Sequence, residues 1–126
     1  MKKHFLLSAL FLSLAFGMFA EQNRDGAEQI YIQYGQTGNH TEHYLPADAP
    51  MVYFDADDME IIIEADGFAS YYEVDIISQV TMLTVISTWV GGYGDTVDVS
   101  SLTIGYYQIV ITSSNNNVYE GYFTVE

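Results

Sequence analysis

The stretch Leu102-Thr-Ile-Gly105-Tyr-Tyr107-Gln-Ile-Val-Ile-Thr112 decides the fold. It has the pattern L-x-x-G-x-Y and runs directly into an alternating, apolar-rich strand. This is the sequence form of a tyrosine corner, the turn at which a chain crosses between the two sheets of a β-sandwich. We expect Leu102 to close the end of the core and Gly105 to take a backbone conformation that other residues avoid. The buried Tyr107 hydroxyl is expected to bond a main-chain group a few residues upstream.

Apolar-rich segments flank this corner and recur about every ten residues after Pro50, which is the spacing of an all-β sandwich. Several of them alternate cleanly: Ile61 and Ile63 share one face of their segment, and Glu60 and Glu64 share the other. No segment after the N-terminal run has helical periodicity. The sequence therefore predicts an immunoglobulin-like antiparallel β-sandwich of about seven strands over residues 51–126. The expected strands are 51–55, 59–65, 71–77, 81–90, 96–99, 102–112 and 118–125.

The N-terminal 20 residues have the composition of a secretory signal peptide. Lys2 and Lys3 precede an apolar run over residues 5–16, which is short compared with the roughly 20 residues of a membrane span. We expect cleavage after Ala20, with Gly17 as the alternative site; the alternative to cleavage is an uncleaved anchor. The protein is then exported, to the periplasm, the cell surface or the medium. Residues 21–50 are expected to be a leader with one strand at 30–34 and a loop up to Pro50.

Charge and cysteine content exclude several classes of function. Without the signal peptide, Arg24 is the only Lys or Arg against 17 acidic residues, a net charge of −16 with histidine neutral. Such a chain has no basic patch for nucleic acid or for anionic membranes, and its charge favours a monomer. The chain has no cysteine, which excludes a disulfide and a lipid anchor attached through cysteine.

Exposed aromatic side chains are the most informative candidates for a ligand surface. Tyr71, Tyr106 and Tyr122 fall on strand faces opposite the predicted core, and Trp89 and Tyr93 flank a Gly-Gly turn. Such rings stack on sugars or anchor a protein partner. Tyrosine is also a common strand residue that is half-exposed without a binding role.

Two groups of residues have side chains that can bind a metal ion. His40 and His43 lie three positions apart in the loop before Pro46, too few ligands for a zinc site. The acidic turn Asp55-Ala-Asp-Asp58, with Glu60 close by, resembles calcium loops but lacks their D-x-D-x-D-G spacing. We therefore expect no metal site or cofactor, with calcium at this turn as the open alternative.

The sequence contains no recognisable catalytic pair of a nucleophile and a base. No serine lies in a G-x-S-x-G elbow, and both histidines after the signal peptide lie in the loop. We therefore do not expect an enzyme.

The motifs P-x-x-Y-x-D, V-x-V-x-x-L-x-x-G-x-Y-x-I-x-I and Y-x-G-x-F-x-V follow one another along the chain. Their named positions are Pro50, Tyr53, Asp55, Val97, Val99, Leu102, Gly105, Tyr107, Ile109, Ile111, Tyr119, Gly121, Phe123 and Val125. This order resembles a family of small exported proteins known as domain of unknown function 3244. The resemblance implies an immunoglobulin-like fold, export in Bacteroidetes-type bacteria and no established activity. In addition, Asp95-Thr-Val97 resembles the acceptor pattern for O-linked glycans on exported proteins of such bacteria, with Thr96 as the modified residue.

Taken together, these features predict an exported acidic β-sandwich, most simply a non-enzymatic module that binds another protein. The alternative is a carbohydrate-binding module that uses its exposed tyrosines and Trp89. A flat row of rings on one sheet would favour sugar, and scattered rings would favour a protein partner.

Overall fold

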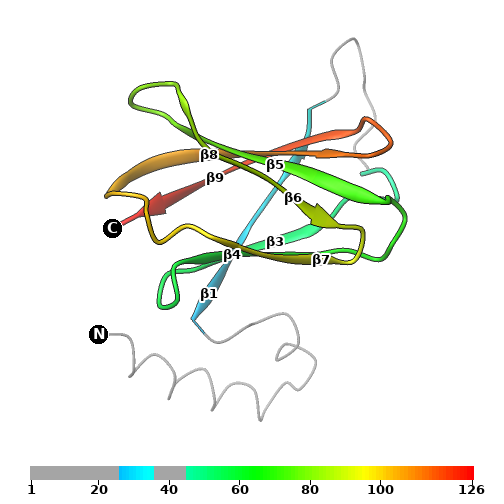
Figure 1. Cartoon of the computed structure of the whole chain (residues 1–126), viewed down its shortest axis with the longest axis horizontal. Helices are drawn as coiled ribbons and strands as arrows, with labels where there is room; N and C mark the ends of the chain where they lie inside the picture. Colours follow the sequence, from blue (N-terminus) through cyan, green and yellow to red (C-terminus); the bar gives the residue numbers. More distant parts are fainter. Residues whose placement is uncertain (1–25, 36–44) are drawn as a thin grey trace.

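The computed structural model describes residues 26–35 and 45–126, which form a two-layered sandwich of β-strands (Figure 1). The predicted signal peptide over residues 1–20 lies outside these residues. No helix of the described chain is long and apolar enough to cross a membrane. The strands are β1 (Ala27–Ile30), β2 (Gln33–Tyr34), β3 (Met51–Asp55), β4 (Glu60–Glu64), β5 (Tyr71–Ser78), β6 (Thr84–Gly91), β7 (Gly94–Asp98), β8 (Gly105–Ser113) and β9 (Val118–Val125).

The strands form one four-stranded sheet in the order β1-β3-β4-β7 and one five-stranded sheet in the order β2-β9-β8-β5-β6. Every pairing in both sheets is antiparallel. Seven of the strands, β3 to β9, follow Pro50. The predicted all-β antiparallel sandwich is therefore confirmed.

The core lies between the two sheets and is built from alternating residues of each strand. The inward positions predicted for three strands are fully buried, because each is apolar and its neighbours in sequence are polar or turned to solvent. These residues are Ile61 and Ile63 of β4, Tyr72, Val74 and Ile76 of β5, and Tyr107, Ile109 and Ile111 of β8. Phe54 and Phe123 bridge the two sheets with ring centroids 5.0 Å apart.

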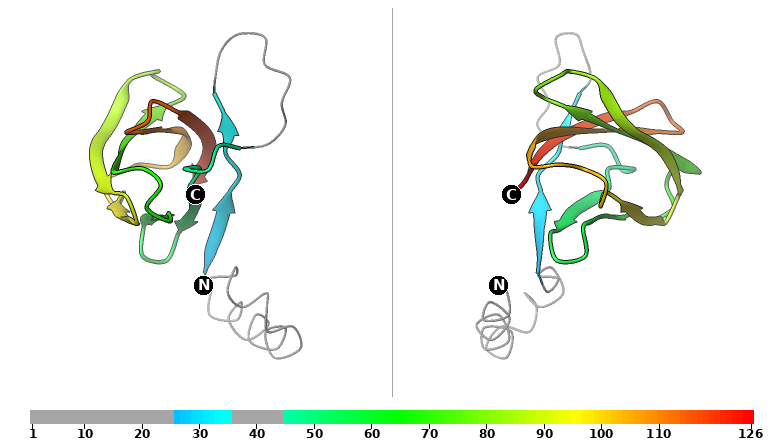
Figure 2. Two further views of the ribbon diagram at one scale, coloured as in Figure 1. Left: turned by 90° about the vertical axis from the view of Figure 1, so that its right-hand side faces the viewer. Right: turned by 60° about the vertical axis from the view of Figure 1, so that its left-hand side comes forward.

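The sandwich begins earlier than the sequence predicted, because residues 27–34 take part in both sheets. Instead of one strand at 30–34, β1 pairs with β3 and β2 pairs with β9. Figure 2 shows these two strands following one another along the side of the sandwich. Where the chain changes sheets it passes over Gly121 of β9, whose missing Cβ would lie 2.6 Å from Ile30 Cγ2. Gly121 is thus the residue of β9 that allows this close crossing.

The tyrosine-corner stretch carries the chain from β7 of one sheet into β8 of the other. The Tyr107 hydroxyl donates a hydrogen bond of 2.7 Å to the main-chain oxygen of Thr103, and Leu102 packs against the core. The expectation for Gly105 was wrong: it is not among the glycines with positive φ. A Cβ there would meet the Tyr107 ring at 3.6 Å, which is ordinary contact, so the turn does not require glycine at this position.

Strand β6 begins three residues later than the sequence predicted. The sequence predicted a strand over 81–90, but β6 begins at Thr84 because residues 78–83 form a turn. In this turn the Met82 N–H donates to the Ser78 oxygen at 2.7 Å, and Met82 has a φ of 61°. The turn leaves the apolar side chains of residues 80–83 outside the ladder, where they are exposed.

Candidate functional site

The outer face of the five-stranded sheet carries four of the five aromatic residues singled out from the sequence. Tyr71 of β5 contacts Trp89 of β6 with ring centroids 5.0 Å apart and planes tilted by 51°. Tyr106 of β8 stacks on Tyr122 of β9 at 5.5 Å and 14°. All four rings are exposed, Trp89 most of all at 60 %. We refer to this surface as the outer face.

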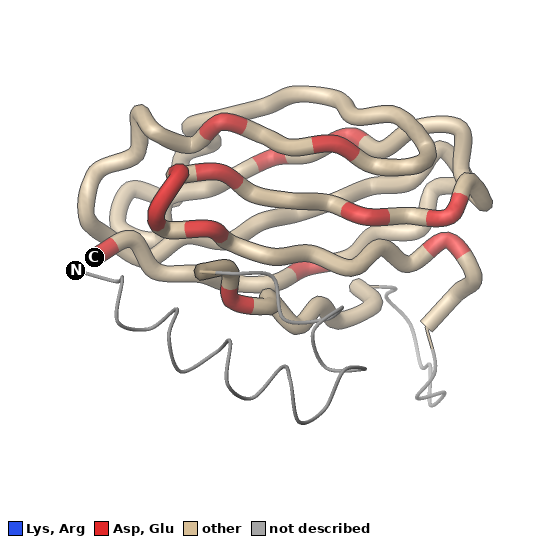
Figure 3. The backbone as a smooth tube through the Cα atoms, turned by 90° about the horizontal axis from the view of Figure 1, so that it is seen from below, with Lys and Arg blue, Asp and Glu red and all other residues tan. Residues whose placement is uncertain are grey.

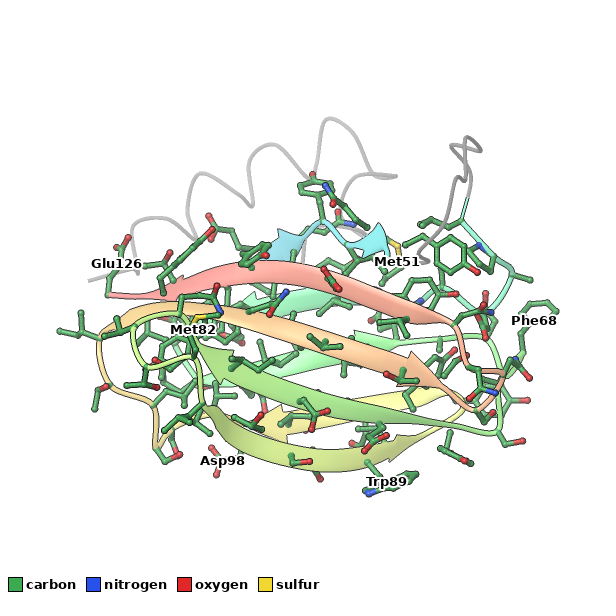
Figure 4. All side chains as sticks on the ribbon, turned by 90° about the horizontal axis from the view of Figure 1, so that it is seen from above. Met51, Phe68, Met82, Trp89, Asp98 and Glu126 are labelled. Carbon is green, nitrogen blue, oxygen red and sulfur yellow. The ribbon has the colours of Figure 1, made fainter. Side chains whose placement is uncertain are left out.

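The two ring pairs lie at opposite ends of the outer face. Trp89 is in register with Glu73 of β5, whereas the main-chain oxygen of Tyr106 accepts from Gln79 beyond the other end of β5. Glu73 and Gln79 are six residue steps apart. At ~3.3 Å per residue, the two ring pairs are therefore separated by about 20 Å along the strands. Figure 4 shows Trp89 near one end of this sheet and Met82, in the turn beside Tyr106, at the other. The fifth aromatic residue, Tyr93, lies in the β6–β7 turn and packs over Gly67.

Exposed aliphatic side chains gather at the Tyr106 end of the sheet. Val80 is 82 % exposed, and its neighbours in the β5–β6 turn and the residue that precedes β8 are also exposed. We call this group, with the tyrosine pair, the turn-end cluster. It consists of Val80, Met82, Leu83, Ile104, Tyr106 and Tyr122. A group of exposed apolar side chains of this kind is typical of a surface that binds a partner.

All charged side chains of the described residues are negative. The three Lys and Arg residues of the chain, and its three histidines, all lie outside residues 26–35 and 45–126. Figure 3 accordingly shows acidic positions on many strands and no basic one along the described backbone. Glu73 and Asp75 of β5 lie on the outer face between the two ring pairs. A ligand of the outer face therefore meets negative charge, which attracts cationic groups and repels anionic ones.

A buried carboxylate is the feature that the sequence did not reveal. Asp48, in the loop before β3, is 4 % exposed and accepts hydrogen bonds from the side chains of the β8–β9 turn. Asn115 Nδ2 donates to it at 2.9 Å, Asn117 Nδ2 donates at 3.2 Å, and the Tyr119 hydroxyl donates in a short bond. The Tyr72 hydroxyl donates to the Asp48 main-chain oxygen at 2.7 Å. Asn115 and Asn117 of the β8–β9 turn therefore also serve as donors to a buried anion.

The protonation of this network follows from burial and from its donors. Burial alone raises the pKa of Asp48, but hydrogen bonds from Ser113, Tyr119, Asn115 and Asn117 together lower that pKa below the usual value. Burial and the nearby Asp48 charge raise the pKa of Tyr72 to about 12. Burial, with the hydrogen bond to Asp48, also raises the pKa of Tyr119. The carboxylate is charged and the Tyr72 and Tyr119 phenols are neutral at physiological pH. The network joins the loop before β3 to β5 and to the β8–β9 hairpin.

Three carboxylates of the predicted acidic turn lie together. The oxygens of Asp55, Asp58 and Glu60 lie within 4.8 Å of one another. One of them already has a structural role, because Asp55 Oδ1 accepts the main-chain N–H groups of Asp57 at 3.0 Å and Asp58 at 3.2 Å. This is an Asx-type turn, which by itself explains Asp55 at the end of β3. The other predicted metal-binding pair, His40 and His43, lies outside the described residues.

The predicted acceptor of O-linked glycans lies on an edge strand. Thr96 is exposed in β7 rather than in the turn before it, and its N–H is capped by Asp95 Oδ1 at 2.8 Å. Its partner on β4 is Ile62, on the face opposite the core. The hydroxyl is therefore accessible to a modifying enzyme.

Comparison with known proteins places the fold. No family model matches the chain, and no curated protein matches its sequence. Among solved structures, the chain is similar to a DUF3244 family protein with an immunoglobulin-like β-sandwich fold from Bacteroides vulgatus ATCC 8482. The two share 13% sequence identity with a TM-score of 0.62, over 79% of this chain and 99% of that chain. The chain is thus an immunoglobulin-like β-sandwich that shares its fold with a DUF3244 family protein.

Proposed function

We propose that this protein is an exported, non-enzymatic module that binds another protein through the outer face and the turn-end cluster. The observation that carries the proposal is the concentration of exposed apolar and aromatic side chains on this one surface. Aromatic and aliphatic anchors of this kind supply most of the energy in protein interfaces. The signal-like composition of residues 1–20 supports export.

The separation of the ring pairs favours a protein over a sugar as ligand. A carbohydrate-binding face needs rings that lie flat in a row, whereas these pairs are about 20 Å apart along the strands. The Tyr106 and Tyr122 rings stack on each other, which leaves less of each ring face open to a ligand. Anchors at two ends of a sheet suit the larger footprint of a protein partner.

Site-specific photo-crosslinking tests the proposal. A benzophenone amino acid at Met82, in protein made and processed by its own cell, is expected to give one discrete cross-linked product. The matched control is the same group at Met51, which is also an exposed methionine but lies on the four-stranded sheet. Equal products from both positions, or none from Met82, would contradict the proposal.

Carbohydrate binding is the second candidate because Trp89 and Tyr71 form an exposed aromatic pair. Binding to a glycan array that is lost in Trp89→Ala and retained in Tyr106→Ala would favour it over the protein-binding proposal. Retention of the signal by Trp89→Ala would exclude that pair as the sugar site.

A further inference from the structure

The edge strand β6 has no partner strand on one side, and its pairing with β5 is regular from Ile86 onward, after a β-bulge at Val85. It is the last strand of the five-stranded sheet and pairs only with β5 (Figure 4). It is also the longest edge strand of the described chain, with eight residues against two in β2, four in β1 and five in β7. An edge of this kind presents unpaired main-chain groups to any strand that comes alongside.

The direction of these groups follows from the bonds on the two sides of β5. The Tyr71 oxygen accepts from Ser114, beyond β8, whereas the Ser78 N–H donates to Leu83, toward β6. Because main-chain groups point to alternate sides along a strand, Tyr72, Val74 and Ile76 direct theirs toward β6. Their partners Val90, Thr88 and Ile86 point back toward β5. The main-chain groups of Ser87 and Trp89 therefore point to the open edge, whereas Val85 is the extra residue of a β-bulge and does not follow this alternation.

The sequence of β6 lacks the residues that usually protect such an edge. Natural edge strands are blocked by charged side chains, above all lysine, by proline or by a short length. The run Thr84-Val-Ile-Ser-Thr-Trp-Val-Gly91 contains no charge and no proline. The half-buried Ile86 faces the interior at this edge, and an added strand would cover it.

The charges beside the edge are all negative. Glu73 and Asp75 lie on the neighbouring strand β5 at the level of Trp89 and Ser87, and Asp75 accepts the Ser87 hydroxyl at 2.6 Å. Asp95 and Asp98 are exposed on β7, the edge strand that follows β6 in the chain. A second copy would bring the same carboxylates to the contact, and like charges placed together cost free energy. A basic strand is instead attracted to all four.

We propose that the open edge of β6 binds an extended basic segment of the partner protein, in which lysine or arginine alternates with apolar residues, as an added strand. The basic side chains lie over Glu73 and Asp75, and the apolar ones cover Ile86. This inference rests on the proposed function and names the chemistry of the partner. The mode is β-strand addition, in which main-chain bonds give affinity and alternate side chains give specificity.

A synthetic peptide in which valine alternates with lysine tests the inference, with Trp89 as the probe because it is the only tryptophan of the chain. We expect a saturable change in Trp89 emission with this peptide and at least roughly tenfold weaker binding of the peptide with glutamate in place of lysine. Ser87→Pro removes an outward N–H and is expected to weaken binding of the lysine peptide about tenfold or more. Ser87→Ala, the matched control, loses only the hydroxyl bond to Asp75 and is expected to bind as the wild type does.

A second test does not depend on whether Ser87→Pro folds. It uses two versions of the lysine peptide, one N-methylated on its odd-numbered amides and the other on its even-numbered amides. An added strand turns only one edge toward β6, so only one of these peptides is expected to lose binding. Equal binding of both, unaltered binding by folded Ser87→Pro, or a dimer of the protein that Ser87→Pro dissociates would overturn the inference. If the Met82 crosslink persists in Ser87→Pro while the peptide results fail, the edge inference falls and the proposed function stands.

Discussion

Replacing Asp48 by asparagine is expected to cost about 3 kcal/mol of the free energy of unfolding, because it removes a buried anion without changing the shape of the side chain. Asn115, Asn117 and Tyr119 all donate to this carboxylate. An asparagine keeps one acceptor oxygen and turns an NH₂ group toward the remaining donors. One buried donor then loses its partner, at about 1–3 kcal/mol, and the other bonds change from charge-assisted to neutral, at about 1 kcal/mol each.

Urea unfolding followed by circular dichroism at neutral pH measures this loss, with the slope of free energy against urea as the check that both proteins unfold alike. For a domain of this size about 3 kcal/mol also lowers Tm by roughly 12–20 °C. Asp66→Asn is the matched control, since it removes the same charge from an exposed position. That variant is expected to stay within about 0.5 kcal/mol of the wild type.

The same change alters the pH dependence of stability in a defined direction. The donors depress the pKa of Asp48 in the folded protein, so its stabilisation is complete above the ordinary carboxyl pKa of about 4. It is lost as the pH falls through the lower pKa of the folded state. The difference between wild type and Asp48→Asn should therefore be constant from neutral pH to about 5 and shrink in stronger acid. A loss below about 1 kcal/mol at neutral pH, or one equal to that of Asp66→Asn, would refute the role assigned to this carboxylate.

Three further outcomes are expected. Tyr107→Phe should lose about 1 kcal/mol in the same urea assay, because it removes the bond to Thr103 and retains the ring; a loss of only a few tenths would contradict the corner. Gly94→Ala should lose more than about 2 kcal/mol, since Gly94 has a φ of 93° and a Cβ would lie 2.0 Å from the Ile63 oxygen; an unchanged unfolding midpoint would count against that crowding. Intact mass spectrometry of protein from its own cell is expected to show mass beyond the bare processed chain that Thr96→Ala removes, and a bare mass in the wild type would rule the modification out.

Most of the fold after Pro50 could be predicted because apolar and polar residues alternate within each strand. In β4, β5 and β8 every second residue is apolar and faces the core, while most of the residues between them are polar and face out, as the pleat of a strand requires. The start of β6 was placed too early because Thr81 and Met82 have the composition of a strand. Their main chain is held in a turn by Ser78, a bond that composition does not reveal.

The features that sequence reasoning missed depend on partners far along the chain. Ile30 and Tyr34 look like one strand, and only the positions of β3 and β9 divide them between two sheets. Asp48 lies in a polar loop between two prolines, and Asn115 and Tyr119, which donate to its carboxylate, come 67 and 71 residues later. The sequence feature that comes closest to indicating this network is the run of three asparagines shortly before Tyr119. A turn by itself does not require so many amide side chains.

The pairing of β2 with β9 has a consequence for the order in which the chain folds. Tyr34 lies opposite Tyr119, so one ladder joins the earliest part of the described chain to its last strand. Closing a loop of that length loses chain entropy before the new contacts stabilise the fold. Sandwiches rich in contacts between residues far apart in the sequence therefore fold in milliseconds to seconds. The β5–β6 and β8–β9 hairpins can form from neighbouring residues, and β1 needs only β3, whereas β2 pairs with the last strand. During synthesis β2 therefore remains without its ladder until β9 has emerged.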